Sequence, residues 1–462
     1  MTTVIKKDGA KEPFNPQKIA IAANKAAVRC DITLTNKDLA NIIKTVETKI
    51  KGLDEVPVSL LHELTIASLS ANGFKDVSAS YAEYRYYKTQ YAKTFEKLHQ
   101  DADDVLRLGD RENANFDSAL VSTKGSLIKG YLTKSLYKQF YMSKQEKFLI
   151  DRGDIYAHDL RDMILGCVNC CLFDIGEVLR GGFEMSNVQY TEPKTVLSAL
   201  QVIGDITLVA TAQQFGGFTL PELDKVLLPY VKKSYNSAYY RYHNELGLEK
   251  EKAERQARLD TIREIEQGFQ SLELKLNTVP CSRGDFAFTT VSFGQWDYKN
   301  ISKDDAFWLM TIGKVILKTR REGHGKNHRP VVFPKLSFLY DKNQIDADIY
   351  SKELFDEAVK TSAQCMYPDY LSLSSKYGAV SQLFQKTGAV TSGMGCRAYL
   401  TPWANEKGQY ITTGRCNIGA VSLNLPLILR IVQYQHPDDW KEAFWPELNE
   451  RLEAIREFLK KR

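Results

Sequence analysis

The sequence predicts an α/β protein in which a small N-terminal unit precedes a larger unit of alternating strands and helices. Residues 1–100 open with a hairpin pattern and continue as helices, which is a complete small α/β unit. From residue 101 to residue 462, short apolar runs such as "CCLFDI" and "VVFPKLSFL" alternate with helical stretches. Alternation over this length favours an α/β barrel or a layered sheet.

In the N-terminal unit, "TTVIKKDGAKEPF" reads as two short strands joined at Asp8-Gly9, a two-residue turn signal. A helix is expected in "NPQKIAIAANKAAV", with Asn15 as its cap and Pro16 at its first position. Three further helices are expected in "NKDLANIIKTVETKIKGL", "SLLHELTIASLSANG" and "VSASYAEYRYYKTQYAKTFEKLH".

In the larger unit, helices are expected in "PKTVLSALQVIGDITLVATAQQ", "LPELDKVLLPYVKKSYNSAYYRYHNELG" and "EKEKAERQARLDTIREIEQGFQSLELKLNTV". The last is so rich in charge that we expect a solvated face. "SLNLPLILRI" begins a helix that either Asn424 or Ser422 caps, with Pro426 in its first turn.

The composition is that of a globular protein, with 43% hydrophobic and 26% charged residues among 462. A net charge of +5 is mild for this length, so we expect no nucleic-acid partner. No apolar run is long enough to span a membrane, and the first residues lack the apolar core of a signal peptide. A cytoplasmic protein without a membrane partner is therefore expected.

The eight cysteines are expected to stay reduced in that compartment. The cluster "GCVNCCLFDI" has no second ligand pair at similar spacing, so we expect no metal site in this chain. The cysteines are Cys30, Cys167, Cys170, Cys171, Cys281, Cys365, Cys396 and Cys416.

Lysines surround the N-terminal turn and the following helix start, which together make a phosphate cradle. From charge alone, a surface hairpin with solvated lysines is the alternative. The stretch resembles the ATP-cone domain of ribonucleotide reductases, whose pattern is V-x-K-R-D-G, an acidic residue and F-x-x-x-K-I, here with Lys7 in place of arginine. The resemblance implies that ATP and dATP bind as activity regulators, not as substrates. It assigns this contact to Val4, Lys6, Lys7, Glu12 and Lys18.

Cys396 stands in "GAVTSGMGCRAYLTPW", a run of small residues in which Gly393 and Gly395 permit close backbone approach. A packing cysteine usually lies in an apolar run, so a loop-tip role is favoured over a small core cysteine. This region and "GQYITTGRCNIGAVSLNLP" resemble the finger-loop region of anaerobic (class III) ribonucleotide reductase. Further matching motifs follow in the family's order: "ENAN" (Glu112–Asn115), "IYAHDL" (Ile155–Leu160), "NCCL" (Asn169–Leu172), "FQSLELKLNT" (Phe269–Thr278), "FPKLSF" (Phe333–Phe338) and "MYPD" (Met366–Asp369).

The resemblance implies most of a ten-stranded α/β barrel of the glycyl-radical type, and anaerobic reduction of ribonucleoside triphosphates under ATP/dATP control. It assigns the thiyl radical to Cys396 and the donation of a hydrogen atom to Cys170. Asn417 matches the asparagine of members that use formate as reductant. Because successive strand side chains point to opposite faces, Cys171 and Cys167 are interpreted as structural, and Cys416 should point away from Asn417. An inward Cys416 would instead permit a thiol reductant.

The helix start after Asn424 offers free N–H groups to a substrate triphosphate, and the family suggests this role for Ser422 and Asn424. An ordinary helix cap is the alternative. His158 in "AHDL" is a candidate to hydrogen-bond the substrate or formate, although a lone histidine is more often structural.

The family's glycyl-radical motif, R-V-x-G-Y, and its four-cysteine zinc site do not occur in the sequence. The chain therefore resembles the N-terminal two-thirds of such an enzyme. The resemblance implies a homodimer with deoxynucleotide effectors, a radical-SAM iron–sulfur activating enzyme, and a glycyl-radical polypeptide if the enzyme is split. Two alternatives stay open: a non-catalytic nucleotide sensor, and a glycyl-radical enzyme similar to pyruvate formate-lyase.

Overall fold

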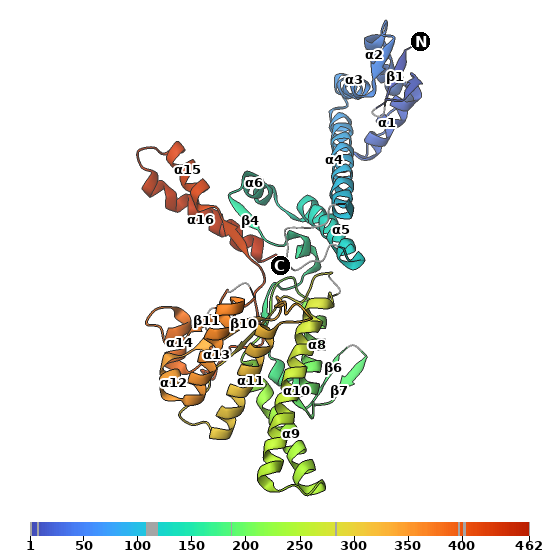
Figure 1. Cartoon of the computed structure of the whole chain (residues 1–462). Coiled ribbons are helices and arrows are strands. Elements are labelled where there is room, and N and C mark those ends of the chain that lie inside the picture. Colours follow the sequence, from blue (N-terminus) through green and yellow to red (C-terminus); the bar gives the residue numbers. More distant parts are fainter. Residues whose placement is uncertain are drawn as a thin grey trace. The chain divides into compact units, whose positions relative to one another are not determined.

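The computed structural model describes residues 2–6, 9–107, 119–185, 187–281, 284–395, 398–400 and 403–461. These residues form two compact units, Met1–Asp101 and Ala102–Arg462 (Figure 1). Each unit has its own hydrophobic core. The motif Glu112–Asn115 lies outside the described residues.

The N-terminal unit has a three-stranded sheet in the order β2-β1-β3. Strands β1 (Thr3–Ile5) and β2 (Lys11–Pro13) pair in antiparallel fashion, which confirms the strands of the predicted hairpin. Asp8 of the predicted turn lies outside the described residues. A parallel third strand, β3 (Glu55–Pro57), was not predicted, because three residues show no periodicity.

Four helices complete this unit, as predicted: α1 (Pro16–Val28), α2 (Asn36–Ile50), α3 (Val58–Ala71) and α4 (Lys75–Arg107). The Asn15 side chain accepts a hydrogen bond from the backbone N–H of Gln17 at 2.9 Å, so the predicted cap of α1 is confirmed. Apolar side chains of α1–α3 close a core over the sheet, around Val4, Ala23, Ile42, Val46, Val56 and Leu69.

The second unit contains a six-stranded sheet in the order β11-β10-β9-β8-β5-β12. Five strands are parallel: β5 (Cys171–Leu172), β8 (Phe218–Leu220), β9 (Thr289–Phe293), β10 (Lys335–Tyr340) and β11 (Asp369–Ser372). The sixth, β12 (Arg415–Cys416), runs antiparallel to β5. A mixed α/β fold with a mainly parallel sheet is therefore confirmed, while closure into a ten-stranded barrel stays a prediction.

Helices cover one face of this sheet: α8 (Val196–Thr211), α9 (Leu223–Tyr240), α10 (Lys250–Thr278), α11 (Lys303–Glu322) and α13 (Ile349–Cys365) (Figure 1). The shared core joins strand residues such as Phe218, Val291 and Phe338 to these helices. The charged helix α10 has the expected solvated face, but its other face is buried through Ile265 and Phe269.

The remaining helices and strands of this unit lie outside the six-stranded sheet and the five helices that cover it. They are α5 (Val121–Leu136), the π-helix η1 (Tyr137–Tyr141), α6 (Lys144–Arg152), β4 (Ile155–Ala157), the 3-10 helix η2 (Leu160–Leu165), α7 (Ile175–Leu179), the hairpin of β6 (Phe183–Met185) and β7 (Val188–Tyr190), the π-helix η3 (Arg241–Glu245), α12 (Lys342–Ala347), α14 (Ala379–Thr387), β13 (Val421–Leu423), α15 (Leu425–Gln435) and α16 (Trp440–Leu459). In the described part of the chain, no helix is both long and apolar enough to cross a membrane.

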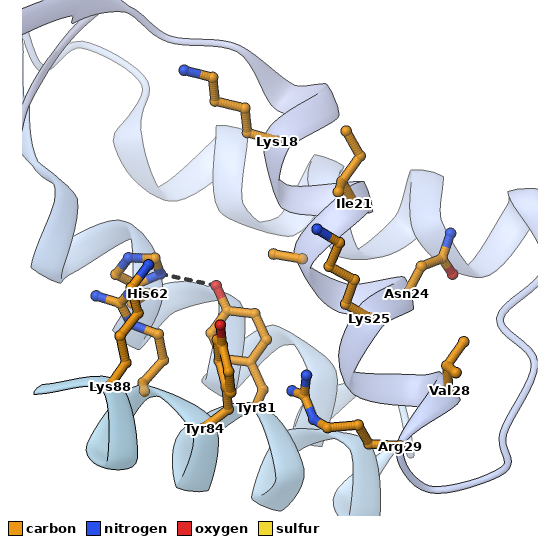
Figure 2. A pocket seen from close by; sticks show the side chains of 12 residues that line it. Lys18, Ile21, Asn24, Lys25, Val28, Arg29, His62, Tyr81, Tyr84 and Lys88 are labelled. Atoms are coloured by element: carbon orange, nitrogen blue, oxygen red, sulfur yellow. Dashed lines mark hydrogen bonds between the residues drawn. The ribbon is translucent and has the colours of Figure 1, made fainter. Parts of the chain in front are cut away.

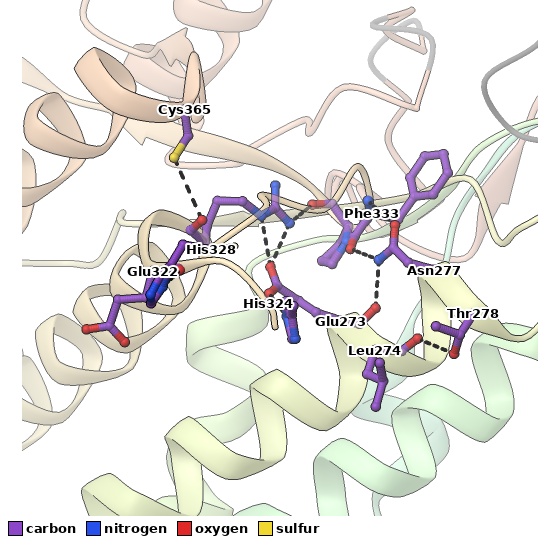
Figure 3. Close-up of polar contacts among 11 residues, drawn as sticks. Glu273, Leu274, Asn277, Thr278, Glu322, His324, His328, Phe333 and Cys365 are labelled. Carbon is purple, nitrogen blue, oxygen red and sulfur yellow. Dashed lines mark hydrogen bonds and ion pairs between the residues drawn. The ribbon is translucent and has the colours of Figure 1, made fainter. Parts of the chain in front are cut away.

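A buried ion pair ties α10 to α11 (Figure 3). Arg320 donates from Nε to Glu273 Oε1 at 2.9 Å, and both side chains are fully buried. His324 Nε2 lies 2.9 Å from the other carboxylate oxygen of Glu273, which raises the pKa of His324 above its usual 6.5. Removing one partner of such a pair leaves an uncompensated buried charge, at a cost of about 3–5 kcal/mol.

Candidate functional site

The face of the sheet opposite these helices carries small polar side chains, whereas the helix-covered face is mostly apolar. Thr219, Thr290, Ser292 and Ser337 alternate with apolar neighbours along β8, β9 and β10, and all four are buried. This "polar face" is covered by residues 388–395, which we call the inner loop. Thr219 Oγ1 donates to the carbonyl of Gly393 at 3.2 Å, and the hydroxyls of Ser292 and Ser392 lie 2.9 Å apart.

Two glycines let the inner loop touch the sheet. A β-carbon on Gly217 would stand 2.6 Å from the Cα of Gly395, a separation that real β-carbons do not show. A β-carbon on Gly395 would in turn stand 2.7 Å from the ring of Phe288. Cys396 follows Gly395 in the sequence but lies outside the described residues, so its predicted role stays a prediction.

Cys170 lies beside this contact. Its Sγ accepts a hydrogen bond from the backbone N–H of Gly217 at 3.0 Å and lies 3.4 Å from Asn169 Oδ1. Only 2% of the residue is exposed, and it packs with Leu172 and Met394. The thiol therefore belongs to the same buried region as the inner loop.

Asn417 is joined directly to Cys170, although 247 residues separate them in the sequence. Its side-chain oxygen accepts from the backbone N–H of Cys170 at 3.0 Å, and its own backbone N–H donates to the Cys170 carbonyl at 2.9 Å. The structure thus brings together two of the three predicted catalytic residues.

Cys171 and Cys416 lie on the opposite, helix-covered face. Cys171 packs against the large core, and burial raises the pKa of its thiol to about 12. Cys416 is its direct partner across the β5–β12 ladder, and strand alternation places it away from Asn417, as expected. Cys167 lies outside the strands, with its Sγ 3.8 Å from the carbonyl oxygen of Asp162.

His158 and Ser422 lie together beside the small sheet of β4 and β13, whereas Asn424 lies at the other end of that ladder, where its N–H donates to the carbonyl of Asp154. His158 Nε2 lies 2.8 Å from the hydroxyl of Ser422. Asn424, not Ser422, caps α15, since its side-chain oxygen accepts from the N–H of Leu427 at 3.2 Å. Because Pro426 has no N–H and Leu427 donates to the cap, Leu425 carries the one N–H group of the first turn that lacks an intrahelical partner.

The N-terminal unit contains a cavity of about 580 Å³ between α1, α3 and α4 (Figure 2). A smaller cavity of about 150 Å³ shares Lys18, His62 and Tyr81 with it and reaches Val4 and Glu12. His62 Nδ1 lies 2.8 Å from the Tyr81 hydroxyl, as Figure 2 shows. Five basic side chains line the larger cavity: Lys18, Lys25, Arg29, Arg85 and Lys88.

Glu12 holds two of the predicted lysines in place. Its carboxylate oxygens lie 2.7 Å from Lys18 Nζ and 2.8 Å from Lys6 Nζ. These hydrogen bonds, that of Lys18 first and that of Lys6 second, hold the pKa of Glu12 below its usual value. Lys7 lies outside the described residues.

Sequence reasoning missed the other groups that line these cavities. His62 of α3 lines both cavities, but it belongs to no sequence motif that would indicate a function. Tyr81, Arg85 and Lys88 recur at helical spacing along α4, a pattern that could have placed them on one face. Among the residues that the structure describes, no three His, Cys, Asp or Glu side chains gather as a metal site.

Comparisons with known proteins agree with this two-part organisation. Residues 2–90 match the family model of the ATP cone domain, and residues 112–462 match that of anaerobic ribonucleoside-triphosphate reductase. The anaerobic ribonucleoside-triphosphate reductase of Escherichia coli (strain K12) is 31% identical over 470 residues, covering 99% of this chain and 62% of that protein. The protein of the same description from Enterobacteria phage T4 is 30% identical over 78% of this chain and 56% of its own length.

Solved structures of similar description also match, among them that of the Thermotoga maritima anaerobic ribonucleotide reductase in complex with dATP and CTP. It is 16% identical with a TM-score of 0.47, over 80% of this chain and 63% of that one. The chain thus spans about three fifths of the length of the curated relatives that it matches.

Proposed function

Because the chain belongs to the anaerobic ribonucleoside-triphosphate reductase family, we propose that it forms the nucleotide-binding and hydrogen-abstracting part of such an enzyme. The reaction would convert ribonucleoside triphosphates to deoxyribonucleoside triphosphates. One observation carries the proposal: Cys170, Asn417 and the inner loop that leads to Cys396 meet on one buried polar face.

The chemistry explains why a thiol belongs beside this face. The 2′-hydroxyl of a ribonucleotide leaves with difficulty, but a radical at C3′ makes it a far better leaving group. We assign to Cys396 the removal of the C3′ hydrogen atom. A glycyl radical elsewhere in the complete enzyme would generate the Cys396 thiyl radical. The close packing of Gly395 on Gly217 supports this role, since it fixes the loop immediately before the sulfur.

Cys170 would then give a hydrogen atom to the substrate. Its burial and the N–H of Gly217 hold its sulfur in one position, as a hydrogen-atom donor requires. We assign formate as the reductant, which supplies two electrons and leaves as carbon dioxide. Asn417 suits this, because a neutral amide does not repel the formate anion as a carboxylate would.

The substrate triphosphate is proposed to bind at the first turn of α15, where the positive end of the helix dipole and the N–H of Leu425 would attract an anion. Asn424 caps this turn, and the hydrogen-bonded pair of His158 and Ser422 belongs to the β4–β13 sheet that leads into it. These side chains would orient the substrate and take no part in bond breaking.

The cavities of the N-terminal unit are proposed to bind ATP or dATP as regulators. Lys6 and Lys18 would hold phosphates with Lys7, while Glu12 keeps the first two in place. Val4 lines the smaller cavity and would contact the base of the nucleotide there. His62 and Tyr81 add a polar pair between the cavities, which sequence reasoning did not identify.

The glycyl radical and the zinc site have no matching motif among these 462 residues. We assign them to the part of the relatives' length that these residues do not span, which would be a second polypeptide if the enzyme is split. The complete enzyme would be a homodimer that binds deoxynucleotide effectors, and a radical-SAM iron–sulfur enzyme would activate it.

The test is anaerobic turnover of labelled CTP with formate, ATP, the activating enzyme and the glycyl-radical segment supplied. We expect dCTP to form with the wild-type chain. Formation at the same rate without formate would reject the reductant assignment. Absence of dCTP under every combination would favour the second candidate, a nucleotide sensor, which the separate core of the N-terminal unit makes physically reasonable.

A further inference from the structure

Two cysteines face each other across the β5–β12 ladder on the side that the proposed chemistry does not use. Cys171 of β5 is the register partner of Cys416 of β12, in an antiparallel pair. Directly opposed residues share one face of a sheet, so both side chains lie on the face opposite to Cys170. Cys171 is partly buried and Cys416 is exposed.

The backbone hydrogen bonds around Cys171 show whether Cys171 and Cys416 are a hydrogen-bonded or a non-hydrogen-bonded pair of the ladder. Its backbone N–H donates to the Gly217 carbonyl, on the β8 side, at 3.0 Å. The next residue back, Cys170, accepts from the N–H of Asn417 on the β12 side. Cys171 and Cys416 are therefore a non-hydrogen-bonded pair, in which Cα atoms lie about 4.5 Å apart. That separation lies within the range of about 4.4–6.8 Å that disulfides span.

We propose that Cys171 and Cys416 are a modification site: they form a reversible intrachain disulfide when the protein meets a low-molecular-weight disulfide such as oxidised glutathione. The register of β5 and β12 places the two thiols opposite each other whether or not the chain has the proposed catalytic activity.

The exposure of the two thiols sets the order of the steps. Cys416, as a thiolate, attacks one sulfur of oxidised glutathione, and one glutathione thiolate leaves. Cys171 then gives up its proton and attacks the Cys416 sulfur of the mixed disulfide, and the second glutathione leaves. In sum, two protein thiols and one oxidised glutathione give one protein disulfide and two reduced glutathiones. Burial raises the pKa of Cys171, so the second step should be the slower one.

The disulfide would fasten β12 to β5 beside Asn417 and Cys170. These two residues are already joined by hydrogen bonds from side chain to backbone and from backbone to backbone. The disulfide would keep Asn417 and Cys170 in this arrangement. The oxidant would react with the exposed Cys416 before it reaches the buried Cys170.

The experiment treats the full 462-residue chain with oxidised glutathione under anaerobic conditions, then blocks free thiols and maps tryptic peptides. Residues 162–180 and 416–430 each lie between tryptic sites, so one cross-linked peptide should appear. The first contains three cysteines, so fragment ions must assign the bond to Cys171. We expect two of the eight thiols to disappear, and reduction to restore both.

Variants separate this site from its neighbours. Cys416→Ser and Cys171→Ser should each abolish the cross-link, whereas Cys167→Ser, in the same peptide, should retain it. If Cys171→Ser misfolds, Cys416→Ser suffices, because its side chain is exposed. A bond to Cys167 or Cys170, or glutathione that stays on Cys416 while Cys171 remains reduced, would overturn the proposal.

Discussion

A β-carbon on Gly217 would stand 2.6 Å from the Cα of Gly395, so the two residues can pack this closely only because residue 217 has no side chain. The contact places the inner loop against Gly217, the residue that precedes β8 and donates its N–H to the sulfur of Cys170. The inner loop and the residue before β8 are about 180 residues apart in the chain. They pack against each other because each has a glycine at the point of contact.

Gly217→Ala should displace the inner loop. The added methyl group meets backbone atoms, which cannot move aside as a flexible side chain does. Such overpacking typically costs about 1–3 kcal/mol. We expect a lower free energy of unfolding and strongly reduced deoxynucleotide formation, with nucleotide binding by the N-terminal unit preserved.

Gly125→Ala is the matched control, since it lies in α5 and a β-carbon there meets nothing within 4 Å. It should stabilise the chain slightly, as alanine does in helices. Equal loss of stability in both variants, measured by denaturant unfolding, would contradict the steric account.

Asn417 can be tested with two substitutions that separate hydrogen bonding from charge. Asn417→Ala removes the acceptor of the Cys170 N–H, which costs about 1–3 kcal/mol when the group stays unsatisfied. Asn417→Asp keeps an acceptor oxygen but adds a negative charge, so it should stay close to wild type in stability and need much more formate. Thermal unfolding and the formate dependence of turnover check the two effects. An unchanged formate requirement in Asn417→Asp would contradict the proposal that residue 417 lies beside the formate anion.

If ATP or dATP binds in the cavities of the N-terminal unit, as proposed, Lys18→Met should lose affinity for dATP. A hydrogen bond to a charged group contributes about 1.5–3 kcal/mol, which corresponds to about tenfold to a hundredfold in the dissociation constant for dATP. Lys49→Met, on the exposed side of α2, lines neither cavity and should bind dATP as the wild type does. Calorimetric titration would measure both. Equal affinity in Lys18→Met and Lys49→Met would place the nucleotide elsewhere.

The Glu273–Arg320 pair predicts a pH-dependent stability through His324. Its hydrogen bond to Glu273 raises the pKa of His324 in the folded state above 6.5, while burial and Arg320 act in the opposite direction. The stabilisation is therefore complete below pH 6.5 and is lost as the pH rises through the folded-state pKa. Thermal unfolding midpoints between pH 6 and pH 9 should fall more steeply for wild type than for His324→Gln. Parallel profiles would show that His324 contributes no such linkage.

The fold could be predicted where local chemistry determines it. Asn15 and Asn424 cap their helices because a side-chain oxygen satisfies the first free N–H groups, and that preference is visible in a few residues. Strands β3 and β5 contain three and two residues, too few to show a period, so β3 was missed and β5 was predicted only within a longer apolar run.

The candidate site could be predicted only through resemblance. Cys170 and Asn417 contact each other although 247 residues separate them in the sequence. No local sequence pattern predicts a contact between residues so far apart. His62 was missed for the same reason, since its position opposite Tyr81 depends on how α3 packs on α4. The opposite orientations of Cys170 and Cys171 did follow from strand alternation, because that rule needs only two adjacent residues.

The most direct measurement compares wild type with Cys396→Ala in anaerobic turnover of labelled CTP, with dATP binding measured on the same preparations. If the sulfur of residue 396 removes the ribose hydrogen, the variant forms no dCTP and binds dATP with unchanged affinity. Formation of dCTP by Cys396→Ala above background would contradict the proposed mechanism.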